Sequence, residues 1–283
     1  MPSSSTPTER QRRLGAELRK MRTAAEATTA YAAGLLGVDR TKISNMEVGV
    51  RPVAPERVRT LACNYACPDD RYVDALVEMA EQRERGWWEQ YRGTLPSGLL
   101  DIAELEWNAV RIRTAQTVHL PGLLHTDGYA RAVFGAVLPA LSRLEVELRV
   151  AHRMERQRVL DRENPVDYVG YVHEAALRMQ FGGRDVTRDQ LAYLCAASER
   201  ENIDVRVIPV SRGAFPGAGH ALLYAHGVVP QLDTVQLDSA HGPEFMHAEA
   251  QLTKYRAHLD WMEEAALGAA ESRDFIHAVA RQL

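Results

Sequence analysis

Residues 28–49 read TTAYAAGLLGVDRTKISNMEVG, and this stretch decides the fold of the first part of the chain. Apolar residues at helical spacing end at Leu36, and Gly37 is suited to close a helix in a left-handed conformation. Asp39 then provides an N-cap for a second helix that runs to Val48. The stretch therefore predicts two short helices joined by a tight turn.

The second of these helices has two different faces. Ile43 and Met46 lie three residues apart and predict an inward face, whereas the other positions are polar. A helix this short is not stable alone, so it needs flanking helices as a platform, and its polar face stays free. The residues of the polar face are Arg40, Thr41, Lys42, Ser44 and Asn45.

These side chains match chemical groups that DNA presents. Arg40 can form a forked pair of hydrogen bonds with a guanine edge, Asn45 can pair with an adenine edge, and Thr41 can contact a thymine methyl group. Phosphate contacts position a protein on DNA without reading its sequence. The residues better suited to phosphate are Lys42, Ser44 and, in the following loop, Arg51.

Three more helices surround this pair. Apolar residues recur at helical spacing from Leu14 onward, Pro55 stands at a helix start where proline is tolerated, and a fifth helix begins near Asp69. Together they predict a mainly α-helical DNA-binding domain of five helices over 10–82. A Ser-, Thr- and Pro-rich tail at 1–9 is expected to be disordered.

The N-terminal segment resembles the helix-turn-helix of the Xre family, the lambda-repressor-like DNA-binding domains. The resemblance implies that the helix over 39–48 lies in the major groove, and that Arg22 and Glu47 pair to orient it. Thr29 stands where the family has a Gln that contacts phosphate or base, so the resemblance implies a phosphate contact for Thr29. The matching residues are Leu14, Gly15, Leu18, Arg19, Met21, Arg22, Thr28, Ala33, Leu36, Gly37, Val38, Arg40, Ile43, Ser44, Glu47 and Gly49.

Two residues before the second helix depart from the family pattern. Glu26 stands where Gly is usual, so it must avoid a left-handed conformation or adopt one at a steric cost. Ala27 stands where Leu is usual, which thins the core.

Composition limits the classes of protein that the chain can be. It has 283 residues, of which 46% are hydrophobic and 25% charged, values typical of a globular protein rather than a disordered or collagen-like one. No apolar run reaches the ~18 residues that span a membrane. No secretory leader is evident, and three Cys favour a reducing cytoplasm. Scattered His residues and the lack of a GxSxG sequence predict no metal, no cofactor and no enzyme.

Charge is divided unevenly along the chain. Residues 1–65 carry 11 Lys and Arg against 6 Asp and Glu, a balance of +5. The whole chain carries a formal net charge of −4, so residues 66–283 carry −9. A basic head on an acidic body favours a polyanion partner for the head, with chance clustering as the alternative.

The second part of the chain predicts a different fold class. Gly86 to Gly98, GWWEQYRGTLPSG, has the Gly and Pro breakers of a linker, which we place at 83–98. Residues 99–283 combine helical periodicity with β-rich segments, which predicts an α+β domain with a small β-sheet. The expected strands cover 166–172, 203–210, 220–225 and 232–238, and the expected helices cover 100–117, 126–136, 141–160, 173–180, 187–200, 244–266 and 271–281.

This second part is similar to the domain of unknown function DUF5753, which follows Xre-type domains in actinomycete regulators, among them relatives of Streptomyces development regulators. The resemblance rests on GWWEQYRGTLP (86–96), LPGLLHTDGYARAV (120–133), RMERQ (153–157) and IDVRVIPVSRGAFPG (203–217), in that order. It implies an antitoxin-like transcription regulator encoded beside a small partner protein of the DUF397 type. It defines no ligand.

Three groups of residues are candidates for a ligand or partner site in this part. The candidates are Trp87, Trp88, Tyr91, His125, Tyr129, Arg153 and Arg156. The first three form an aromatic wall or pack the domain junction. The His and the following Tyr flank a helix start that an N-cap at Thr126 also explains. The two Arg share one side of a helix, where they bind an acidic partner or are solvated and paired with acidic neighbours.

We expect a cytoplasmic, sequence-specific transcription regulator that joins the nucleoid when it binds its double-stranded DNA operator. As a homodimer it would bind two half-sites about one helical turn apart. The C-terminal domain would supply dimer contacts and receive a signal from a small DUF397-type protein or a small-molecule effector. The alternative is an antitoxin-like interaction module that sequesters such a small protein, with DNA binding secondary. A third hypothesis is a small-molecule sensor with a closed pocket.

Overall fold

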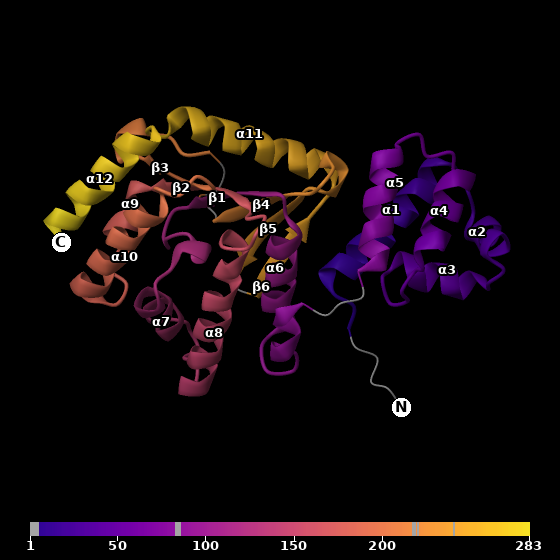
Figure 1. The fold of residues 1–283 in the computed structure, drawn as a ribbon, viewed down its shortest axis with the longest axis horizontal. Helices are drawn as coiled ribbons and strands as arrows, with labels where there is room; N and C mark the ends of the chain where they lie inside the picture. The colour runs from indigo at the N-terminus through magenta and orange to yellow at the C-terminus, as the bar shows by residue number, and fades with distance from the viewer. Residues whose placement is uncertain (1–5, 83–85, 217–218, 220, 240) are drawn as a thin grey trace. The chain divides into compact units, whose positions relative to one another are not determined.

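The chain folds as two compact units that meet in sequence between Glu89 and Gln90 (Figure 1). The first is all-helical, and the second is an α+β domain with a six-stranded mixed sheet, so both predicted fold classes are confirmed. Within the described residues, no helix combines the length and the apolar character that a membrane crossing needs. The structure is a computed structural model, and it describes residues 6–82, 86–216, 219, 221–239 and 241–283.

The N-terminal unit has the five helices that the sequence predicts. Local signals place their ends, because Asp39 and Asp69 cap the third and fifth helices and Pro55 opens the fourth. Thr8 accepts a hydrogen bond from the backbone N–H of Gln11 and so caps the first helix inside the expected tail, whose residues 1–5 lie outside the described residues. The helices are α1 (Glu9–Ala24), α2 (Thr29–Leu36), α3 (Arg40–Glu47), α4 (Pro55–Asn64) and α5 (Asp70–Glu81).

Helix α1 packs backbone against backbone on the C-terminal end of α3. A Cβ atom added to Gly15 would lie 2.5 Å from the carbonyl oxygen of Met46, so only glycine allows this approach. The side chains of Leu18, Ile43 and Met46 are each 2% exposed and fill the space around it. The inward face predicted for α3 is therefore confirmed.

The sheet of the C-terminal unit has the order β3-β2-β1-β4-β5-β6. Strands β1, β2 and β3 run parallel to one another, whereas the β1–β4, β4–β5 and β5–β6 pairs are antiparallel. Strand β1 is therefore where the sheet changes from parallel to antiparallel. The strands are β1 (Arg111–Gln116), β2 (Asp167–His173), β3 (Ile203–Ile208), β4 (Leu222–His226), β5 (Thr234–Ser239) and β6 (Gly242–Met246).

Two strands replace parts of predicted helices. The helix expected over 100–117 ends at Asn108 and is followed by β1, and the helix expected over 244–266 is preceded by β6. Strand β1 carries polar residues that are buried by partners distant in sequence. Arg113 reaches Glu263 with Nη2 3.0 Å from Oε2, and Thr114 Oγ1 lies 3.0 Å from the Tyr168 hydroxyl. No local pattern in the sequence marks such a strand.

Helices cover both faces of the sheet (Figure 1). On one face, α11 packs Leu252, Leu259 and Met262 against the strands. On the other face lie the remaining helices, with a core that includes Ile112 and Tyr168. The helices of this unit are α6 (Ser97–Asn108), α7 (Asp127–Gly135), α8 (Arg143–Arg156), α9 (Glu174–Arg178), α10 (Gly183–Ala197), α11 (Glu249–Ala265) and α12 (Ala269–Gln282), with short 3-10 turns η2 (Gly122–Leu124), η3 (Gln157–Leu160), η4 (Val210–Arg212) and η5 (Pro230–Leu232). The 3-10 turn η1 (Trp87–Tyr91) spans the boundary between the two units.

Candidate functional site

The turn between α2 and α3 is closed by the residues that the sequence indicated. Gly37 has φ 61°, in the left-handed region, and the N–H of Val38 donates to the carbonyl of Ala33 at 3.0 Å. The Asp39 carboxylate accepts a hydrogen bond of 2.8 Å from the N–H of Lys42, and this bond lowers the pKa of Asp39. Both helix ends are therefore fixed locally, which sets the direction in which α3 leaves the turn.

An ion pair ties the end of α3 to the end of α1. Arg22 donates from Nε to Oε1 of Glu47 at 2.6 Å and from Nη2 to Oε2 at 2.9 Å, a two-bond fork. Its Nη1 donates to the carbonyl of Ala27 at 2.8 Å. The pair that the family resemblance implied is present. Arg22 thus holds α3, α1 and the segment before α2 with one guanidinium group.

Glu26 resolves the choice that the sequence left open. It adopts φ 52°, so a residue with a side chain occupies the left-handed region. Its side chain is exposed, and its N–H donates to the carbonyl of Thr23 at 3.0 Å. The turn before α2 therefore keeps its geometry although glycine is missing.

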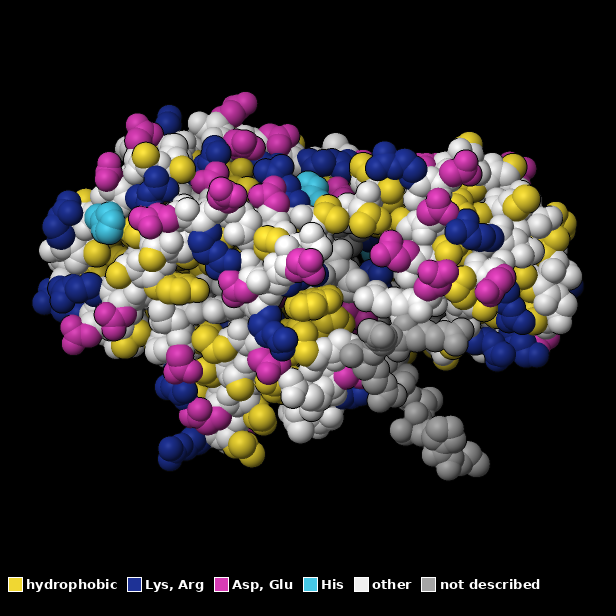
Figure 2. Space-filling model, in the orientation of Figure 1, with side chains coloured by type: hydrophobic (Ala, Val, Ile, Leu, Met, Phe, Trp, Pro, Cys, Tyr) yellow, Lys and Arg dark blue, Asp and Glu magenta, His cyan; other side chains and the backbone are white. Residues whose placement is uncertain are grey.

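The outer side of α3 carries the predicted polar residues. Arg40, Thr41 and Ser44 are exposed, and no ion pair to Arg40 occurs among the described residues. Ser44 donates from its hydroxyl to the carbonyl of Arg40 at 3.2 Å. Figure 2 shows Lys and Arg side chains at the lower edge of the N-terminal unit, where Figure 1 places α3.

The other predicted contacts frame this helix. Lys42 is half-buried and pairs with Asp39, with Nζ 3.1 Å from Oδ2, and Asn45 is also half-buried. Thr29 is the first residue of α2, directly after the cap at Thr28, and is half-buried. Arg51 is exposed in the loop after α3. The structure therefore brings the seven predicted residues to α3, the start of α2 and the loop that follows α3.

The three aromatic candidates lie in η1, which spans the boundary between the two units, and Trp88 and Tyr91 are buried whereas Trp87 is half-buried. Trp88 is 4% exposed and makes an edge contact with Trp87, with ring centroids 5.8 Å apart. Tyr91 is 9% exposed and packs edge-on against His152 of α8 at 5.1 Å. None of the three lines the cavity described below.

His125 is buried after η2 and has a defined tautomer. Its Nε2 lies 2.8 Å from the carbonyl oxygen of Leu120, which only accepts, so Nε2 carries the proton. Its Nδ1 lies 3.1 Å from Nη1 of Arg153, which only donates, so Nδ1 accepts. Burial, and then the charge of Arg153, hold the pKa of His125 well below its usual range. The ring is therefore a neutral support for Arg153.

Arg153 and Arg156 lie on the same side of α8 but have different partners. Arg156 forms a buried two-bond pair with Glu106 of α6, with Nε 2.8 Å from Oε2 and Nη2 2.5 Å from Oε1. Arg153 contacts neutral His125 and places its guanidinium carbon 4.9 Å from the ring centroid of Phe134. Burial, and then the like charge of Arg156, lower the pKa of Arg153 to about 9. Arg156 is thus neutralised within the fold.

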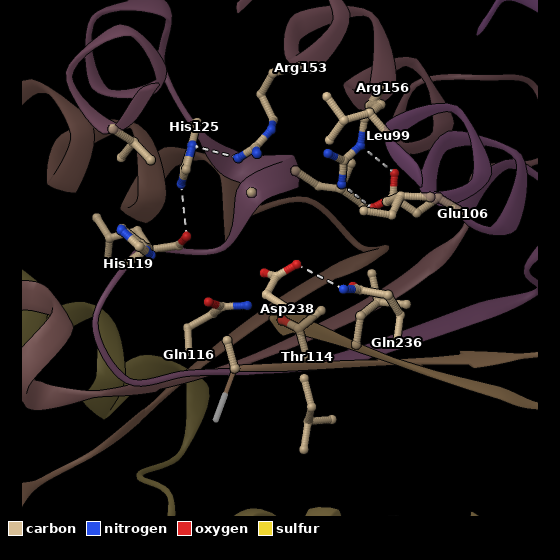
Figure 3. Close-up of a pocket in the computed structure, with 18 of the residues that line it drawn as sticks. Leu99, Glu106, Thr114, Gln116, His119, His125, Arg153, Arg156, Gln236 and Asp238 are labelled. Carbon is tan, nitrogen blue, oxygen red and sulfur yellow. Dashed lines mark hydrogen bonds and ion pairs between the residues drawn. The ribbon is translucent and has the colours of Figure 1, made fainter. Parts of the chain in front are cut away.

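These residues border a cavity of about 190 Å³ between α6, α8 and the sheet (Figure 3). The predicted residues His125, Arg153 and Arg156 line it. Tyr129 does not, since it is fully buried and accepts a hydrogen bond from the N–H of Leu120. Polar lining residues that the sequence did not indicate are Glu106, Thr114, Gln116, His119, Gln236 and Asp238.

Comparison with known protein families agrees with this division. A model described as a helix-turn-helix domain matches residues 13–74. A second model, described as a domain of unknown function (DUF5753), matches residues 99–278, more than half of the chain. No curated protein and no solved structure gave a match. With a helix-turn-helix domain ahead of it, this C-terminal match shows that the chain belongs to the DUF5753 family.

Proposed function

We propose that the chain is a sequence-specific, Xre-type transcription regulator that reads double-stranded DNA with α3. The observation that carries the proposal is that the two sides of α3 differ. Its inner face packs on α1 and its end is held by Arg22, while its outer side is polar and exposed. Arg40, Thr41 and Asn45 contact base edges in the major groove. The phosphate contacts come from Thr29, Lys42, Ser44 and Arg51.

The second unit completes the proposal. It makes the chain a homodimer whose two heads bind half-sites about one helical turn apart. It receives a signal from a small protein of the DUF397 type or from a small molecule, and it has no enzymatic role. The protein acts in the cytoplasm. A signal changes DNA affinity only if it binds the DNA-competent and DNA-incompetent states with different affinity.

Fluorescence anisotropy tests the DNA-binding part. The full chain is titrated into labelled DNA from upstream of its own gene and into random DNA of equal length, at several salt concentrations. We expect a preference of about 10³-fold or more for the cognate DNA, since specific sites exceed non-specific ones by that margin. Arg40→Ala with Asn45→Ala removes two base contacts, each worth about 1–3 kcal/mol, and should abolish the preference.

A matched control separates base reading from general charge. Arg71 is exposed on α5, so Arg71→Ala removes one positive charge from the same unit outside α3. It should keep the preference for the cognate DNA. If the wild type shows no preference and the double variant behaves like it, α3 does not read DNA. The interaction-module hypothesis then takes its place, and proteins that co-purify with the chain become the measurement.

A further inference from the structure

The cavity of the C-terminal unit presents a cation without an acidic partner. Arg153 has no carboxylate within ion-pair distance in the described part of the chain, and its Nε is buried without a hydrogen bond. Only Nη1 is used, on the neutral His125. A half-buried guanidinium group in a cavity can bind an anion through its unused N–H donors, because a buried donor without a hydrogen bond is energetically costly.

The opposite wall of the cavity presents an acid. Alternate residues of β1 and β5 face it, and Figure 3 shows Asp238 pointing from the sheet toward the side on which Arg153 and His125 lie. Oδ1 of Asp238 accepts from the Gln236 amide at 2.8 Å, and no ion pair to Asp238 occurs among the described residues. Since Glu106 neutralises Arg156, one positive and one negative group remain to face a ligand.

Part of the lining is apolar, although polar side chains such as Glu106, Thr114 and Gln116 also line the cavity. Leu99, Ile102, Leu123 and Val133 contribute hydrocarbon surface. An apolar cavity of about 150 Å³ holds benzene, so about 190 Å³ admits a molecule of slightly larger size. The cavity adjoins the carboxyl end of β1, because Gln116, the last residue of that strand, lines it.

We propose that this cavity binds a small α-amino acid with an apolar side chain. Its carboxylate meets the free donors of Arg153, its ammonium group meets Asp238, and its side chain lies against the leucines, isoleucine and valine of the lining. A zwitterion leaves the net charge of the cavity unchanged, whereas a phosphate dianion would face Asp238. This inference stands independently of DNA binding by the N-terminal unit.

Isothermal titration calorimetry of the full chain tests the chemistry with matched probes. L-Leucine carries both charged groups, leucinamide lacks the carboxylate, and 4-methylpentanoate lacks the ammonium group. Glycine lacks the side chain, and L-valine shortens it. We expect L-leucine or L-valine to bind, and the loss of either charged group to weaken binding at least tenfold. The proposal is overturned if none of the amino acids binds at concentrations up to about 10 mM, because a dissociation constant above that value corresponds to only a weak binding free energy.

Variants then assign the groups. Arg153→Gln should abolish binding, and Asp238→Asn should weaken the binding of L-leucine but not that of 4-methylpentanoate, which has no ammonium group to lose its partner. Gly122→Ala keeps the charge but places a Cβ atom 2.9 Å from Nη1 of Arg153, so it should displace the guanidinium and weaken binding in a folded protein. The exposed Arg158→Gln is the matched control and should bind as the wild type does.

Two results would contradict the assignment. Retained affinity in both Arg153→Gln and Gly122→Ala would show that the carboxylate lies elsewhere. Inorganic phosphate that binds tighter than L-leucine, and that competes with it, would show an oxyanion site instead of an amino-acid site. The thermal midpoint of each variant reports folding separately, so a binding loss is read only in variants that unfold as cooperatively as the wild type.

Discussion

Breaking the Arg22–Glu47 pair should loosen α3 more than any change on its outer side. The side chains are 14% and 9% exposed, and the pair makes two short hydrogen bonds. Arg22→Ala, Glu47→Ala and the double variant form a double-mutant cycle. Arg22→Ala also loses the bond to Ala27, so its effect should be the larger of the two single changes.

The magnitude follows from burial and geometry. Removing one partner of a fully buried pair costs about 3–5 kcal/mol, because the other charge is left uncompensated. Both side chains here keep some access to water, so we expect about 2–3 kcal/mol for each single variant. The double variant leaves no unpaired charge, so it should lower the free energy of unfolding by about 3 kcal/mol in total. The coupling energy between the two residues is then about 2 kcal/mol.

Hydrogen exchange followed by mass spectrometry measures the local stability of α3 in the full chain. Peptides that cover α3 report the free energy of opening in the N-terminal unit, and peptides from the sheet serve as the internal control. We expect faster exchange of α3 in both single variants and unchanged exchange in the sheet. Additive effects, with a coupling energy below about 0.5 kcal/mol, would refute the reasoning, since they would mean that the two side chains act independently.

Three further predictions concern backbone strain, close packing and pH. Glu26→Gly should stabilise the N-terminal unit by about 0.5–1 kcal/mol, because glycine relieves the left-handed conformation, whereas Glu26→Ala should not; urea unfolding followed by circular dichroism decides. Gly15→Ala should destabilise the unit by about 1–3 kcal/mol through the clash with Met46, while Gly34→Ala, with open space around its added Cβ, should stabilise it by up to about 1 kcal/mol. Burial, and then nearby arginines, lower the pKa of His152 to about 3. Below pH 6.5 the unfolded state therefore binds a proton at this residue that the folded state does not, and the free energy of unfolding falls as the pH drops. From pH 7 to 5 this costs about 2 kcal/mol, and His152→Gln should flatten the pH dependence of urea unfolding followed by tryptophan fluorescence; an unchanged slope would contradict the assignment.

The N-terminal unit was predictable because its signals are local. A glycine at 37, an aspartate at 39 and a proline at 55 each act within four residues of their own position. The pairing of Arg22 with Glu47 came from the family resemblance, since spacing alone does not join residues 25 apart. The sequence shows that Glu26 stands where glycine is usual, but it does not determine whether the residue adopts the left-handed conformation.

The C-terminal unit was predictable in class but not in detail. The sequence predicts helix where β1 lies, because Arg113 and Thr114 give no apolar alternation and the partners that bury them come from α11 and β2. The cavity could not be predicted from the sequence either, because its lining residues come from segments that are far apart along the chain. Arg153 and Arg156 were recognised as neighbours on one helix, yet only the fold shows that Glu106 neutralises one of them and leaves the other to face the cavity.

The way α3 is anchored has a consequence for how such proteins diversify. Its position depends on a glycine contact, two inward side chains and one ion pair, and none of these uses Arg40 or Thr41. Exposed positions of this kind tolerate exchange within about 0.5 kcal/mol. If α3 reads DNA as proposed, gene duplicates can acquire new operators by changing a few outward residues, while the scaffold and the stability of the fold are retained.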